Sequence, residues 1–105
     1  MTARFPFTDL HSFKDYVGFV QLCCPDRWPV RGGVSAAEQW SLDLAFRGLR
    51  LGIDLSQKEK GDLPVFTEAS RLIEQAYAHY ADGEVREGFQ VMDRLVELLG
   101  TVPSW

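Results

Sequence analysis

The fold class of this 105-residue chain is decided by residues 64–99, PVFTEASRLIEQAYAHYADGEVREGFQVMDRLVELL. Apolar residues recur at steps of three and four on both sides of Asp82-Gly83, which is the spacing of a helix face. Pro64 suits the first turn of a helix, because its missing N–H would be unpaired there anyway. The stretch predicts helices over 64–81 and 84–99, joined by a turn so short that they lie antiparallel and side by side.

The apolar positions define the face that each helix is expected to turn to the core. In the first helix they are Phe66, Ala69, Ile73, Ala76, Tyr77 and Tyr80. In the second helix they are Val85, Phe89, Met92, Val96 and Leu99, with Leu95 and Leu98 beside them. Gly100 and Pro103 then mark the end of helical structure.

Two further helices are predicted upstream. In 9–24, five residues share one face, and the proline that follows stops the helix; they are Leu10, Phe13, Val17, Val20 and Cys24. The helix over 36–51 follows Ser35-Ala-Ala-Glu38, a capping box in which both side chains satisfy free amides. Its apolar arc is so wide that we expect it to be the central helix, with Gly48 admitting a close neighbour and Gly52 ending it.

No segment of useful length alternates with a period of two, so the prediction is an all-α fold. We expect a compact four-helix bundle or two packed helical hairpins, in a single domain spanning 1–105. Residues 54–63 are assigned to a polar connector. Whether the first helix packs into the same core as the other three stays open at this level.

Charge is distributed unevenly along the chain. The net charge is −4, and residues 1–60 carry 8 Lys/Arg against 7 Asp/Glu, whereas residues 61–105 carry 3 against 8. The acidic half indicates a basic partner, or serves only solubility, and it argues against nucleic-acid binding. No apolar run approaches the roughly 20 residues of a membrane span.

Adjacent thiols without a secretory signal indicate a reducing cytoplasm. The absence of Asn and the excess of Arg over Lys are typical of a GC-rich, for instance bacterial, coding sequence. Cys23 and Cys24 have no metal-ligand spacing to His11 or His79, so neither a metal nor a cofactor is expected. We interpret both cysteines as buried and inert, and His79 as a structural residue at a helix end.

The loop that starts PDRWPVR holds the candidate binding residues. Trp and Arg are enriched in binding hot spots, and flanking prolines stiffen this segment. The predicted partner contacts are Asp26, Arg27, Trp28 and Arg31. The alternative for Trp28 is a lid folded over the end of the bundle, and Trp105 carries the same ambiguity.

The chain contains no catalytic sequence motif, and three functions remain. The first is a non-enzymatic protein-binding module that occludes a partner, as an immunity protein, an antitoxin or an assembly chaperone does. The second is a homodimer with a structural role, closed through spare apolar surface on the second helix. The third is a small thiol-dependent enzyme that uses Cys23 or Cys24 with His79.

Overall fold

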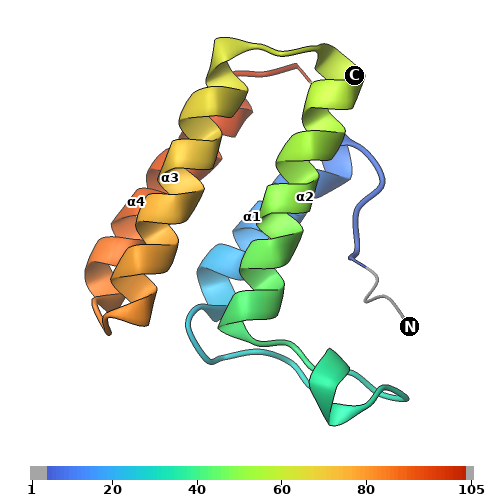
Figure 1. The fold of residues 1–105 in the computed structure, drawn as a ribbon, viewed down its shortest axis with the longest axis vertical. Helices are drawn as coiled ribbons and strands as arrows, with labels where there is room; N and C mark the ends of the chain where they lie inside the picture. Colours follow the sequence, from blue (N-terminus) through green and yellow to red (C-terminus); the bar gives the residue numbers. More distant parts are fainter. Residues whose placement is uncertain (1–4, 104–105) are drawn as a thin grey trace.

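The computed structural model describes residues 5–103 and contains four α-helices within them (Figure 1). Each helix packs against the next one along the chain, and the first also packs against the last. The helices alternate in direction, so they form an antiparallel four-helix bundle, and the predicted all-α class is confirmed. They are α1 Leu10–Cys23, α2 Leu42–Lys60, α3 Pro64–Ala81 and α4 Val85–Gly100.

Three helices lie within one residue of their predicted ends. Asp9 caps α1, because its carboxylate accepts from the Ser12 amide at 2.9 Å and the Ser12 hydroxyl accepts from the Asp9 amide at 3.2 Å. Helix α3 has the predicted bounds, and α4 begins at Val85 after a turn in which Gly83 has a φ of 78°. Local capping and apolar spacing are therefore sufficient to place these helices.

Helix α2 departs from its predicted bounds at both ends. Ser35 and Glu38 form only a 3₁₀ turn, η1 Ala36–Glu38, and the N-cap of α2 is Ser41, whose hydroxyl accepts from the Leu44 amide at 3.1 Å. The predicted polar connector continues the helix, which ends only at Gly61, where φ is 94°. Helix α2 is not central either, since it has two helical neighbours, α1 and α3, as every helix of the bundle does.

The two glycines of α2 receive aromatic side chains from α1. A Cβ atom at Gly52 would overlap the ring of Phe13, and one at Gly48 would overlap the Tyr16 hydroxyl. The Tyr16 hydroxyl donates to the Ala45 carbonyl at 2.8 Å, which satisfies its buried polar atom. Gly52 is therefore a packing position inside the helix rather than its end.

The first helix belongs to the same core as the other three. Five of its residues are buried in one apolar cluster with residues of α2, α3 and α4: Leu10, Phe13, Tyr16, Val17 and Val20. The preceding segment adds Phe5 and Phe7, whose rings lie 6.0 and 4.9 Å from the Tyr16 ring. The Phe5 ring also lies beside Gly48, so part of the wide apolar arc of α2 is covered by this segment and not by another helix.

Helix α4 turns a different face to the core than its spacing predicts. Its buried positions are Gly88, Val91, Met92, Leu95 and Leu99. Val85, Phe89 and Val96, which were expected in the core, remain 44%, 46% and 37% exposed. Gly88 explains the rotation, because it lets the ring of Tyr80 in α3 lie against the α4 backbone. The apolar surface left over faces the side of α4 toward α1.

Candidate functional site

The connection between α1 and α2, residues 24–41, projects beyond one end of the bundle (Figure 1). We call it the α1–α2 loop. The turn between α3 and α4 lies at the same end of the molecule. The loop holds all the residues predicted to contact a partner, namely Asp26, Arg27, Trp28 and Arg31.

Trp28 folds back onto the bundle, as the lid interpretation expected. Its indole ring lies 6.2 Å from the ring of Trp40, nearly parallel at 28°, and 6.0 Å from the ring of Phe19. Its Nε1 atom donates to the Pro25 carbonyl at 2.9 Å. Because both its apolar face and its donor are engaged, Trp28 is only partly accessible to another molecule.

Arg31 is fixed by the residues just before α2. Its guanidinium lies 4.3 Å from the centroid of the Trp40 ring, in a cation–π contact, and Nη1 donates to the Glu38 carbonyl at 3.2 Å. The side-chain amide of Gln39 makes two hydrogen bonds with the Arg31 backbone. Its oxygen accepts from the Arg31 N–H at 2.7 Å, and its nitrogen donates to the Arg31 carbonyl at 2.8 Å. The loop is thus closed on itself by side chains from both of its ends.

Most residues of the loop are exposed, among them the charged residues at its start and the apolar Val30. Asp26 and Arg27 are exposed, as their predicted role requires. Val30, which the sequence did not single out, is 88% exposed, and it lies between Pro29 and the fixed Arg31. Its only sequence signal is an apolar residue inside a segment rich in turn formers. Gln39 and Trp40 were also missed as supports, because a sequence shows no long-range contact.

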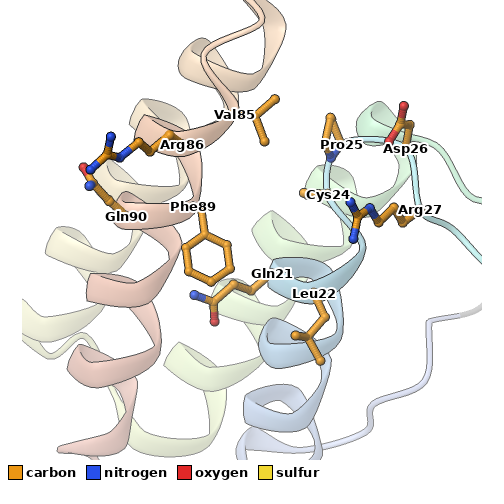
Figure 2. A pocket seen from close by; sticks show the side chains of 10 residues that line it. All are labelled: Gln21, Leu22, Cys24, Pro25, Asp26, Arg27, Val85, Arg86, Phe89 and Gln90. Carbon is orange, nitrogen blue, oxygen red and sulfur yellow. The ribbon is translucent and has the colours of Figure 1, made fainter.

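A second feature at this end is an open groove of about 980 Å³ between the last turn of α1 and the first turns of α4 (Figure 2). We call it the α1–α4 groove. Figure 2 shows Phe89 and Val85 extending from α4 toward α1. The groove is lined by Gln21, Leu22, Cys24, Pro25, Asp26, Arg27, Val85, Arg86, Phe89 and Gln90. Asp26 and Arg27 therefore belong to both features, whereas Trp28 and Arg31 belong to the loop alone.

The groove lies at the end of the region in which hydrogen bonds connect α1 with α4 and the residues after it. Toward the other end of the bundle, the Lys14 ammonium donates to the Val102 carbonyl. Midway, the Gln21 amide donates to the Asp93 carboxylate at 3.4 Å. Beyond Gln21, Leu22 remains 75% exposed. An apolar side chain this accessible, in the same groove as Phe89, marks surface that the bundle itself does not cover.

The two thiols differ in exposure, and both are poor nucleophiles. Cys24 is 8% exposed at the floor of the groove, and burial raises its pKa to about 12, with a smaller contribution from Cys23. Burial also raises the pKa of Cys23, which is half-buried. Because the thiolate is the reactive form, both shifts suppress attack at neutral pH.

His79 lies in the last turn of α3, as its structural interpretation expected. Its Nδ1 atom is 3.1 Å from the Glu84 carboxylate, across the turn into α4. Within residues 5–103, no group of three or more His, Cys, Asp or Glu side chains is placed to hold a metal ion. Across the same residues, no helix combines the length and the apolar character needed to cross a membrane.

Comparisons with protein-family models, with curated proteins and with solved structures gave no match to this chain. Fold and site are therefore interpreted from the chemistry of the residues themselves.

Proposed function

We propose that this protein is a small non-enzymatic binding module that occludes a partner protein through the α1–α2 loop. The observation that carries the proposal is a projecting, internally fixed loop on which Val30 is the most exposed large apolar side chain, at 88%. A loop of this kind fits into a cleft of a partner and blocks it. That mode of action is shared by immunity proteins and antitoxins, and a chaperone that covers an assembly surface uses it as well.

The internal contacts of the loop favour binding because they lower its entropic cost. Fixing a flexible segment on association costs free energy, and the Trp28 and Arg31 contacts with Trp40 meet much of that cost during folding. In this proposal Trp28 and Arg31 support the loop, whereas Asp26, Arg27 and Val30 contact the partner. Trp and Arg are the residue types expected in a binding hot spot, and the loop contains both. Trp28 and Arg31 stabilise the loop and do not themselves contact the partner.

The proposed partner surface is basic. The α3–α4 turn at the same end of the bundle carries Asp82 and Glu84, and Glu87 follows in the first turn of α4. These carboxylates belong to the half of the chain with 8 acidic and 3 basic residues. Complementary charge accelerates encounter and excludes wrong partners, even where it adds little affinity. Free thiols are compatible with a cytoplasmic location, which we include in the proposal.

The test is capture of partners from a lysate of the native host by the tagged protein, followed by mass spectrometry. The wild type is compared with Val30→Asp, which places a charge at the most exposed large apolar side chain of the loop. Leu63→Asp is the matched control, because Leu63 is 39% exposed in the connection between α2 and α3, at the other end of the bundle. Far-UV circular dichroism verifies that all three proteins are folded.

We expect a stoichiometric protein that wild type and Leu63→Asp retain and Val30→Asp loses. A captured protein with a high isoelectric point and a toxic activity would select the immunity-like form of the proposal. If every captured protein is retained equally by Val30→Asp, the loop is not the binding surface and the proposal is wrong. Catalytic turnover by the purified protein would contradict its non-enzymatic part.

A further inference from the structure

The α1–α4 groove has features that the proposed function leaves unused. Val85, Phe89 and Val96 are all partly exposed and follow one another at steps of four and seven residues, so they form one stripe on α4. The stripe is about 16 Å long at 1.5 Å per residue. Leu22 of α1 adds the most exposed apolar side chain of the groove, at 75%. Surface of this kind is covered when a partner is present.

The shape of the groove favours a polypeptide over a small molecule. Small-molecule sites enclose most of the ligand surface, and their lining side chains are largely buried. Here Leu22, Val85 and Phe89 remain 75%, 44% and 46% exposed along an open trough between two helices. A trough of this form accommodates a helix that lays an apolar stripe into it.

The charges beside the stripe identify which helix fits. Arg86 is three residues before Phe89, and Asp93 is three residues after Gln90, so opposite charges lie equally far from the midpoint of the pair Phe89-Gln90. Both charged residues are exposed, and Arg86 has no ion-pair partner among residues 5–103. Asp93 accepts a bond from Gln21 at 3.4 Å and makes no ion pair with another described residue. The pattern is complementary to a copy of itself running in the opposite direction.

We propose that the α1–α4 groove is occupied by α4 of a second copy of this chain, in a two-fold symmetric dimer. With the axis beside Phe89 and Gln90, α4 of each copy runs antiparallel to that of the other. Arg86 then faces Asp93 of the second copy, and symmetry repeats this pair. The Phe89 rings meet near the axis, and each lies in the other's groove beside Leu22. Val30 does not line the groove, so a charge at Val30 tests the proposed function separately from the dimer.

The experiment is sedimentation equilibrium over a series of protein concentrations, with five variants beside the wild type. Arg86→Asp and Asp93→Arg each place like charges opposite one another, and the double variant exchanges the two charges. Arg94→Asp is the matched control, because Arg94 is exposed, makes no ion pair among the described residues and lies outside the groove lining. Phe89→Ser removes the ring at the proposed axis. Circular dichroism verifies folding throughout.

We expect the wild type to approach twice 11.9 kDa as concentration rises. Each single charge reversal should raise the dimer dissociation constant at least about ten-fold, and the double variant should return it to within about three-fold of wild type. Arg94→Asp should leave it unchanged, and Phe89→Ser should abolish the dimer. These shifts distinguish a specific ion pair between Arg86 and Asp93 from a general effect of net charge on association.

Three results would overturn the inference: a monomer at all concentrations, a dimer that survives Phe89→Ser, or single reversals that the double variant does not rescue. A monomer whose groove variants lose a protein from host lysate would assign the groove to a different partner. Failure of the proposed function shows up separately, as retention of every captured protein by Val30→Asp. Different variants therefore test the two proposals.

Discussion

Helix α1 meets α2 through aromatic rings set against the glycines of α2, whereas the last turn of α1 and the first turns of α4 leave an open groove between them. Toward α2, the rings of Phe13 and Tyr16 lie where any Cβ atom at Gly52 or Gly48 would overlap them. Toward α4, long polar side chains such as Gln21 span the gap. Glycine on the receiving helix allows an aromatic ring to reach the backbone, and that difference explains why one interface is closed and the other is a groove.

The largest expected effect concerns the thiol at the floor of the open side. At pH 8, a thiol with a pKa near 12 is ionised to about one part in ten thousand, so alkylation of native Cys24 by iodoacetamide should be roughly a thousand-fold slower than that of a free thiol. Cys23, which is half-buried and whose pKa burial also raises, should react faster than Cys24 but still slowly. Labelling followed by peptide mass spectrometry measures both rates.

The raised pKa of Cys24 also predicts how the stability of the protein depends on pH. Because folding raises the Cys24 pKa, the stability it contributes is complete below its ordinary value near 9, and it is lost as pH rises toward about 12. Cys24→Ala should therefore flatten the alkaline part of the stability profile. Rapid labelling of Cys24 in the folded protein would mean that its thiol is accessible from the groove. It would again favour the hypothesis of a thiol-dependent enzyme.

A second prediction tests the closed side. Gly52→Ala places a methyl group against the ring of Phe13, which is fully buried and has no room to move. Overpacking of this kind costs about 1–3 kcal/mol, which outweighs the gain of less than about 1 kcal/mol from replacing a helical glycine. Urea denaturation followed by circular dichroism measures the loss. A variant as stable as wild type would show that α1 and α2 are not in such close contact.

The sequence predicts what local spacing controls. Capping at Asp9 and apolar periodicity in α3 and α4 place three helices within one residue of their ends. The same reasoning fails at Ser35, where the local pattern of a capping box is present, but Gln39 is engaged by the backbone of Arg31. The helix starts instead after Ser41, and the contact between Arg31 and Gln39, eight residues apart, is not visible in the residue pattern around Ser35.

The candidate site was predictable only in part, for a related reason. Asp26 and Arg27 are exposed as expected, but Trp28 and Arg31 both pack against Trp40, an aromatic residue that periodicity had assigned to the interior of a helix. The groove was not predicted, because the spacing of Val85 and Phe89 fits two positions on α4. It is compatible with the face toward the core and with the exposed stripe beside that face. The Gly88–Tyr80 contact selects between these two faces.

The third prediction concerns Trp40, which links the α1–α2 loop to the closed side of α1. Its ring contacts the rings of Phe19 and Trp28 and the Arg31 guanidinium, at 5.2, 6.2 and 4.3 Å. Trp40→Leu should cost about 1–2 kcal/mol, less than truncation of a fully buried Trp, because Trp40 is half-buried. It should also raise the amide exchange rate at Arg31, which hydrogen-exchange mass spectrometry reads at peptide level. Unchanged exchange would show that the loop holds its shape without Trp40.

The smallest effect is the counterpart of Gly52→Ala at Gly18, a glycine of α1 with open space beside it. A Cβ atom at Gly18 has no heavy atom within 4 Å apart from its own helix and chain neighbours, and Gly18 lies in the interior of α1 with helical geometry. Gly18→Ala should therefore stabilise the protein by about 0.5–1 kcal/mol, because alanine loses less backbone entropy on folding. The same urea titration that shows a loss for Gly52→Ala should show this gain. If Gly18→Ala also destabilises, some other surface covers α1 at this point.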